Sequence, residues 1–181
     1  MAASGAPVHL IELNLTDVKQ LFNSMDPSPF HDKDLDRDAE EFIVSWSREY
    51  PLNEPVTLRV HLENWPEEDP TQLIQEAVHN FFSNKRELEQ REFRRLMRQG
   101  RATLTIGLVF LAVCLVASQL LASNTVGVTS YVRESLTIAG WVAMWKPMEI
   151  YLYDWWPVRR EVRNFARLST MPVEVVATKP A

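Results

Sequence analysis

The sequence predicts an α+β membrane protein: a small N-terminal α/β domain, a stalk helix and a two-helix transmembrane hairpin. Residues 102–122, ATLTIGLVFLAVCLVASQLLA, contain no charge and no proline over 21 residues. About 20 apolar residues in a helix cross the hydrocarbon core of a bilayer once. A second apolar segment follows at residues 135–156, whereas residues 1–83 alternate between strand patterns and helix patterns.

The charge distribution predicts the orientation of the two spans. Residues 1–83 carry 5 Lys+Arg and 16 Asp+Glu, whereas residues 84–101 carry 7 and 3. Lys and Arg gather on the cytoplasmic side of a span, and the connecting residues 123–134 contain a single arginine. We therefore predict a bacterial inner (plasma) membrane protein with both termini cytoplasmic and an external loop. The arginines expected to meet anionic lipid headgroups of the inner leaflet are Arg94, Arg95, Arg98, Arg101, Arg159, Arg160 and Arg163.

The acidic domain is predicted in the order strand–helix–helix–strand–helix. Residues 8–15 have the apolar content of a short buried strand, and residues 56–65 alternate as in a strand with one solvated face. Two strands make only a marginal sheet. Either a weak third strand completes it, or the domain pairs along an exposed edge with a second copy or another protein. We favour self-association.

Apolar residues spaced three and four apart predict the helices of the domain. A short helix begins after Thr16, a second covers residues 34–50 with Asp34 or Asp36 as its N-cap, and a third begins at Thr71. The first of these helices is expected to bury Val18, Leu21, Phe22 and Met25.

The third helix is expected to leave the domain as the basic stalk, residues 84–101, and to bend near Gly100 before it enters the first span. After the second span, apolar residues and arginines alternate over residues 157–168, which predicts a basic amphipathic helix on the inner leaflet. Residues 169–181 are predicted to form a mobile tail.

The second span contains polar side chains that need partners. A charge at the bilayer centre costs at least about 2.5 kcal/mol on insertion scales, and Glu149 lies three residues after Lys146 on the same helix face. Tyr153 continues that face, and Asp154 falls near the headgroups. These residues form either a paired strut or a path for an ion, proton or ligand, and we favour the strut.

Small residues recur along the first span at Gly107, Cys114, Ser118 and Ala122. Because small side chains let helices approach closely, they predict a packing face toward the second span or another copy. Cys114 is the single cysteine, so a disulfide within one chain is impossible.

No motif for catalysis or phosphate binding is present: the chain lacks G-x-S-x-G, Walker and G-x-G-x-x-G sequences. The alternating aspartates from Asp32 to Asp38 begin like an EF-hand loop, but Arg37 replaces the required glycine and Ile43 the glutamate ligand. We therefore predict no catalytic residue, no cofactor, no metal site and no nucleic-acid partner.

The sequence favours a non-catalytic adaptor, assembly factor or sensor subunit that acts through its cytosolic domain. Its expected partners are the anionic inner leaflet and a protein, with a homo-oligomer favoured. One alternative is a small homo-oligomeric channel or transporter lined by Lys146, Glu149 and Tyr153. A second alternative is a membrane-tethered enzyme or metal-binding domain that uses His31, Asp32 and Asp34.

Overall fold

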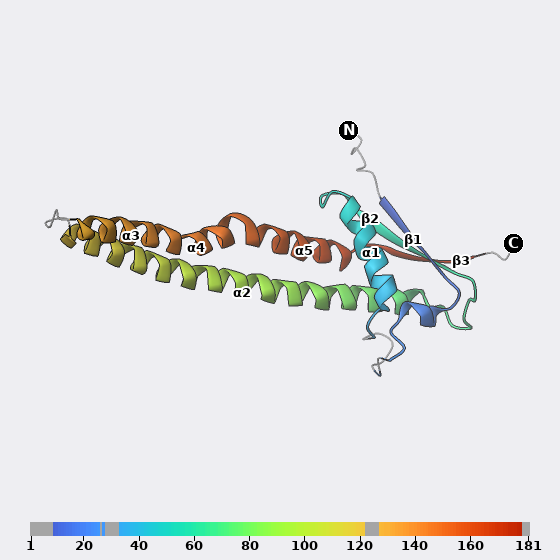
Figure 1. Cartoon of the computed structure of the whole chain (residues 1–181). Coiled ribbons are helices and arrows are strands. Elements are labelled where there is room, and N and C mark those ends of the chain that lie inside the picture. Colours follow the sequence, from blue (N-terminus) through green and yellow to red (C-terminus); the bar gives the residue numbers. More distant parts are fainter. Residues whose placement is uncertain (1–8, 26, 28–32, 122–126, 179–181) are drawn as a thin grey trace, which may run out of the picture. The chain divides into compact units, whose positions relative to one another are not determined.

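A computed structural model describes residues 9–25, 27, 33–121 and 127–178 of the chain (Figure 1). It contains helices and strands in two compact units. The α/β domain comprises Met1–Glu89 and Arg160–Ala181, and the helical unit comprises Gln90–Arg159. The helical unit is therefore inserted into the sequence of the domain, whose last strand comes after it.

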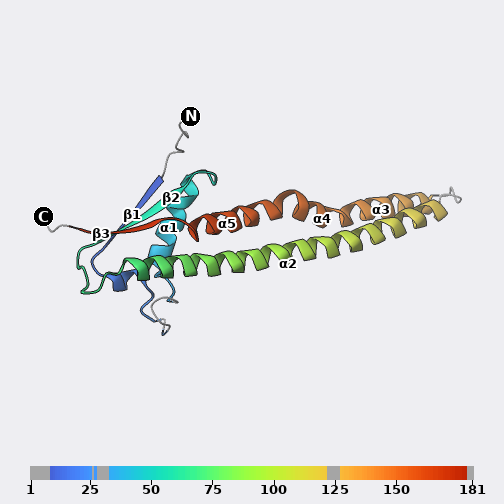
Figure 2. The same cartoon turned by 180° about the vertical axis from the view of Figure 1, so that it is seen from behind.

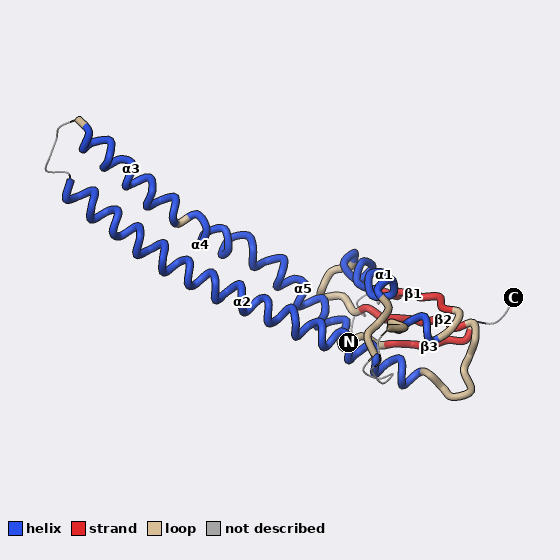
Figure 3. The backbone as a smooth tube through the Cα atoms, turned by 60° about the horizontal axis from the view of Figure 1, so that its bottom comes forward, coloured by secondary structure: helices blue, strands red, loops and turns tan. Residues whose placement is uncertain are grey.

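The sheet of the α/β domain has three parallel strands in the order β1-β2-β3 (Figures 2 and 3). Strands β1 (His9–Leu15) and β2 (Val56–Leu62) confirm the two predicted strands. Strand β3 (Val173–Ala177) lies within the predicted tail, so the prediction of a mobile tail is wrong for these residues. This third strand gives β2 a hydrogen-bonded neighbour on both sides, which the two-stranded prediction lacked.

Two short helical elements connect β1 to β2. The 3-10 helix η1 (Val18–Leu21) buries Leu21, but Met25 is 89% exposed and does not join the predicted apolar face. Helix α1 (Arg37–Glu49) begins as predicted, because the Asp36 side chain accepts a hydrogen bond from the Asp38 N–H at 3.0 Å. An N-cap of this kind satisfies one of the free donors of the first turn.

One face of the sheet carries the hydrophobic core. The strand register aligns Ile11 with Leu58 and Leu58 with Val173, and all three side chains are buried. Helix α1, the first turns of α2 and the last turns of α5 cover them. Phe165 and Leu168 of α5 belong to this core. The predicted placement of this helix's apolar face on the inner leaflet is therefore wrong for these two residues.

The opposite face of the sheet is polar and carries one cross-strand charge cluster. Arg59 of β2 lies between Glu12 of β1 and Glu174 of β3 in the register. Its guanidinium is 2.8 Å from the Glu174 carboxylate and 3.7 Å from that of Glu12. His61 also lies 3.4 Å from Glu12. Arg59 and His61 confirm the polar face predicted for residues 56–65, but Thr57 on the same face is only 7% exposed and the strand ends at Leu62.

Helix α2 (Thr71–Leu120) is 50 residues long and joins the domain to the helical unit. Its start is capped by Asp69, whose carboxylate accepts from the Thr71 N–H at 3.0 Å and the Thr71 hydroxyl at 2.6 Å. The helix continues without a break through Gly100. Among the described residues, α2 is the one helix long and apolar enough to cross a membrane, by length and composition alone.

The returning part of the helical unit is interrupted twice. It comprises α3 (Val128–Ala143), α4 (Trp145–Glu149), the π-helix η4 (Ile150–Asp154) and the start of α5 (Trp155–Leu168). Helix α3 thus begins within the predicted loop at residues 123–134. Proline has no N–H, so Pro147 breaks the hydrogen-bond ladder just after Ala143. The predicted single helix over residues 135–156, with one continuous face, is wrong for this reason.

Glycines mark the contacts between α2 and the returning helices. A Cβ at Gly107 would lie 3.1 Å from the Ala143 carbonyl oxygen, and one at Gly140 would lie 2.8 Å from Leu111 Cδ1. As the position on α2 advances, the contacted position on α3 decreases, so the two helices run antiparallel. This packing requires residues without side chains at the two closest points.

Candidate functional site

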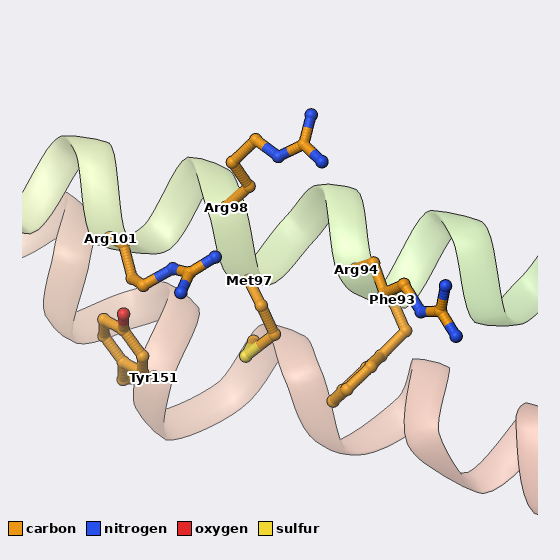
Figure 4. A pocket seen from close by; sticks show the side chains of 6 residues that line it. All are labelled: Phe93, Arg94, Met97, Arg98, Arg101 and Tyr151. Atoms are coloured by element: carbon orange, nitrogen blue, oxygen red, sulfur yellow. The ribbon is translucent and has the colours of Figure 1, made fainter.

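A basic groove lies on the helical unit where α2 passes η4. Its volume is about 470 Å³. Five of its lining residues come from α2 and one from η4 (Figure 4): Phe93, Arg94, Met97, Arg98, Arg101 and Tyr151. On α2 these residues directly precede the apolar run that begins at Ala102. The basic groove is thus adjacent in sequence to the predicted span.

The apolar and the basic lining residues lie on two neighbouring stripes of α2. Arg94, Arg98 and Arg101 are four and three residues apart, so they follow one side of the helix. Phe93 and Met97 are one turn apart on the neighbouring stripe, and Figure 4 shows both pointing toward the helix that carries Tyr151. In the same view Arg98 points away from that helix. Phe93 and Met97 therefore form an apolar wall of the groove, and the three arginines lie beside it.

Gly100 allows the aromatic side of the groove to form. A Cβ at this position would lie 3.0 Å from Ile150 Cγ2 and 3.4 Å from Tyr151 Cζ. A larger side chain would push both residues away from α2. Ile150 and Tyr151 begin the π-helix η4, a type of helix turn that is often found at functional sites. Gly100, at which we expected a bend, instead marks a close helix contact.

The side chains that line the basic groove carry a net positive charge. Arg94, Arg98 and Arg101 are exposed, and none makes a side-chain ion pair or hydrogen bond within the described part of the chain. Arg101 follows Arg94 by seven positions, which corresponds to about 10 Å along the helix. Three positive charges over that distance can bind phosphate or carboxylate oxygens. The lining residues include no carboxylate, histidine or cysteine that would act as a base or nucleophile.

The other predicted headgroup arginines lie outside the basic groove. Arg95 is exposed on α2, and Arg160 and Arg163 are exposed on α5. The Arg159 guanidinium lies 5.5 Å from the ring centre of Trp155, a cation–π contact. The structure therefore brings together three of the seven predicted arginines.

The polar residues of the second predicted span are placed as a pair and two separate side chains. Lys146 Nζ is 2.9 Å from Glu149 Oε2 of the same chain, and their side chains are 57% and 43% exposed. Tyr153 is 71% exposed, and Asp154 is half-buried in η4. The Lys146–Glu149 contact has the geometry of the predicted strut.

The small residues of α2 lie at buried positions. Cys114 and Ser118 are 3% and 8% exposed, and Gly107 is buried beside Ala143. Ala122 lies outside the described residues. Sequence reasoning missed Gly140 of α3, whose position is in contact with both Leu111 and Cys114. Its signal was a lone glycine inside an otherwise apolar helical pattern.

No group of three or more potential metal ligands occurs among the described residues. His31 and Asp32, two of the three residues in the metal-binding alternative, lie outside the described part. Asp36 caps α1 through its bond to Asp38. Asp36 is therefore the N-cap that the sequence predicted for this helix.

A buried polar network in the α/β domain was not predicted. The Arg167 side chain donates to the backbone carbonyls of Ser47, Pro51 and Glu54 and to the Asn164 side chain. Burial lowers the pKa of the Arg167 guanidinium from its ordinary value, an effect that the Glu54 carboxylate opposes. These bonds cap the carboxyl end of α1 and fix α5 to it, so the network serves the fold.

A second groove, of about 530 Å³, lies beside β1. Leu13, Leu15, Ala39 and Phe42 form its apolar part, and Lys19, Asp36 and Asp38 give it mixed charge. We call this the β1 groove. It lies between the edge strand of the sheet and α1.

The outer edge of β1 has backbone groups without a partner among the described residues. The His9 N–H bonds to Pro55 of the segment before β2, and the Leu15 carbonyl accepts from Glu63 just after β2. Since alternate residues of a strand point their backbone groups to opposite sides, Leu10, Glu12 and Asn14 direct theirs away from β2. No bond to these outward groups is present within the described part of the chain.

No family model matches the chain, and no curated protein and no solved structure is found to be similar to it.

Proposed function

We propose that the chain is a two-span membrane protein whose α/β domain is a non-catalytic adaptor that binds a protein partner along β1. The observation that carries the adaptor function is the free outer edge of β1 beside the β1 groove. An extended segment that adds to such an edge gains backbone hydrogen bonds, and adjacent grooves select its side chains. A second copy of the chain is the favoured partner.

The exposed apolar surface of the helical unit supports the membrane location. Ile106, Phe110, Ile138 and Trp141 are 69%, 46%, 64% and 66% exposed. A soluble protein rarely exposes a contiguous apolar surface of this kind. In lipid, the same side chains are removed from water, which is favourable for apolar surface.

Strand pairing supports a return of the chain to its starting side. β2 precedes the helical unit in the sequence and β3 follows it, and the two strands are hydrogen-bonded neighbours. Both must therefore lie on one side of any membrane that the chain crosses, so the number of crossings between them is even. The arginines on both flanks of the helical unit favour the cytoplasm as that side.

Cysteine crosslinking in native membranes tests this function. The protein carries Cys114→Ser and Asn14→Cys, which places one thiol on the outer edge of β1. Oxidation is expected to give a covalent dimer in the membrane pellet, which only detergent releases. Glu63→Cys, placed on the polar segment after β2, is the control and is expected to stay monomeric.

The outcomes separate the parts of the proposal. Protein that stays in solution without detergent contradicts the membrane location. A crosslink to a different protein assigns another partner to the same edge. Protein that remains monomeric and free of any crosslink in the membrane contradicts the adaptor function.

Asn14→Pro gives a second test of the same edge. Proline lacks the N–H that Asn14 directs away from β2, so it weakens addition of a partner strand while the bonds between β1 and β2 remain. Leu13→Pro removes an N–H on the inner side and is expected to damage the sheet itself.

A further inference from the structure

We propose that the basic groove is a binding site for one anionic phospholipid, whose phosphate is held by Arg98 and Arg101 and whose outer headgroup is contacted by Arg94. The inference rests on the proposed membrane location. It goes further by assigning a defined, saturable lipid site to three of the arginines, rather than a diffuse attraction between a basic collar and the leaflet.

The position of the arginines along α2 fits a headgroup. Arg101 directly precedes the apolar run, and Arg98 and Arg94 follow at increasing distance from it. At 1.5 Å per residue, Arg98 lies about 6 Å and Arg94 about 12 Å along the helix from Ala102. Phosphates of a leaflet occupy the layer just outside the hydrocarbon core. Arg98 and Arg101 therefore lie at phosphate depth, and Arg94 lies beyond them.

The charges of the groove are available to a ligand. The three guanidinium groups make no side-chain bond within the described residues, and no carboxylate lines the groove. A phosphate diester accepts paired hydrogen bonds from guanidinium groups, whose planar arrangement of donors matches its oxygens. Net charge and donor geometry thus both favour a phosphate group.

The apolar wall selects a lipid over a free phosphate ion. Phe93, Met97 and Tyr151 line the same groove as the arginines. Inorganic phosphate gains nothing from these three side chains, whereas the glycerol backbone and first methylene groups of a lipid can pack against them. The Tyr151 ring combines an apolar face with a hydroxyl, as is typical of residues at the headgroup level.

Tyr151 forms a wall of the groove that an open patch of charged side chains on a helix surface lacks. Gly100 brings Tyr151 against α2, with Cζ 3.4 Å from the position of a Cβ. Arg95 lies between Arg94 and Arg98 on the same helix and is also exposed, yet it does not line the groove. Arg95 with Arg160 and Arg163 therefore forms a matched set of three exposed arginines outside the site.

Native mass spectrometry of the full chain in detergent tests the site. The probes are phosphatidylglycerol, phosphatidylcholine and inorganic phosphate, each added to the same protein. The groove variant carries Arg94→Ala, Arg98→Ala and Arg101→Ala, and the control variant carries Arg95→Ala, Arg160→Ala and Arg163→Ala. A Tyr151→Ala variant is compared with Tyr153→Ala, and circular dichroism verifies that each variant keeps its helix content.

We expect one retained phosphatidylglycerol per chain, bound at least tenfold more tightly than phosphatidylcholine. One arginine near an anionic surface contributes about fivefold to affinity. The groove variant should therefore bind phosphatidylglycerol at least tenfold more weakly than the wild type, and the control variant within about threefold. Tyr151→Ala should weaken retention and Tyr153→Ala should not.

Equal losses in the two triple variants would overturn the proposal, because they indicate diffuse attraction. Inorganic phosphate that displaces the lipid at millimolar concentration would assign the groove to a soluble anion instead. These results differ from failure of the proposed function, which is detected by solubility without detergent and by the absence of a crosslink at Asn14→Cys.

Discussion

Asn164 of α5 donates a hydrogen bond to Ser47 of α1, with Nδ2 and Oγ 2.9 Å apart, although the two residues are 117 positions apart in the sequence. Both side chains are buried, and the Ser47 hydroxyl in turn donates a hydrogen bond to the Val44 carbonyl. The bond joins the segment after the helical unit to a helix that precedes it. Residues 160–178 are therefore an integral part of the α/β domain.

Ser47→Ala is expected to destabilise the domain by about 1–3 kcal/mol, because it leaves the buried Asn164 amide without an acceptor. Ser45→Ala is the matched control. Ser45 also bonds to the carbonyl three residues before it, but it is exposed. Its loss should change the free energy of unfolding by less than about 0.5 kcal/mol. Amide hydrogen exchange of the peptide containing β2 measures the loss of stability in both variants. Equal losses in Ser47→Ala and Ser45→Ala would contradict the role of the buried bond.

Val173→Asp is expected to disrupt the domain, because Val173 is 3% exposed in the core. Burying an unpaired carboxylate there should cost more than about 2 kcal/mol. Val176→Asp, in the same strand, replaces a side chain that is 40% exposed and should be tolerated. Limited proteolysis of the domain compares the two variants. Equal resistance of both to protease would show that residues 173–177 are dispensable, as a mobile tail would be.

The strands and helices with strong periodicity were predictable, and those that depend on distant partners were not. Residues 56–62 alternate cleanly, and Asp36 precedes an apolar stripe, so β2 and the start of α1 follow from local pattern. β3 is five residues long and lies between Pro172 and the chain end. Its residues form a strand because Leu58 and Val60 of β2 offer them a free edge.

Dependence on residues distant in the sequence also explains why the basic groove of the helical unit could not be predicted. Arg94, Arg98 and Arg101 were identified from charge alone, but their grouping apart from Arg95 depends on where Tyr151 lies. Tyr151 is placed by η4 and by the close contact at Gly100. A π-helix has no signature in a single sequence, and a lone glycine such as Gly100 does not reveal which residue of another helix it will contact.

The start of α2 is expected to lose stability at acid pH. Hydrogen bonds from the Thr71 hydroxyl and N–H lower the pKa of Asp69 from its usual 3.8. A carboxylate with a lowered pKa stabilises the fold above the pKa of the unfolded chain, and this contribution disappears as pH falls through the lower pKa of the folded state.

Asp69→Asn removes the pH-dependent part of the stability that the Asp69 carboxylate provides. The difference in melting temperature between wild type and variant should be constant near neutral pH and should shrink as pH falls below 3.8. Glu68→Gln leaves the bonds between Asp69 and Thr71 in place and is expected to keep the wild-type profile. A difference between wild type and Asp69→Asn that does not change with pH would contradict the capping role.

Gly140→Val is expected to separate α3 from α2. A Cβ at Gly140 already falls 2.8 Å from Leu111 Cδ1 and 3.2 Å from Cys114 Cβ, and overpacking of this kind costs about 1–3 kcal/mol. Ala139→Val, one position earlier at an exposed site, is the control. The rate at which a maleimide labels the buried Cys114 in detergent reports the separation. The rate should rise for Gly140→Val alone, and unchanged labelling would contradict the close packing.

Lys146 and Glu149 are expected to stabilise the membrane-inserted state only as a pair. Each single variant, Lys146→Met or Glu149→Gln, leaves one charge without its partner at 2.9 Å, at a cost of about 2.5–3.5 kcal/mol in the bilayer. The double variant removes both charges and should insert as well as the wild type. Insertion is measured on Ser135→Cys in a Cys114→Ser background, as the fraction labelled from outside by an impermeant maleimide. A double variant that inserts as poorly as the single variants would show that the charges act separately, as residues lining a transport path would.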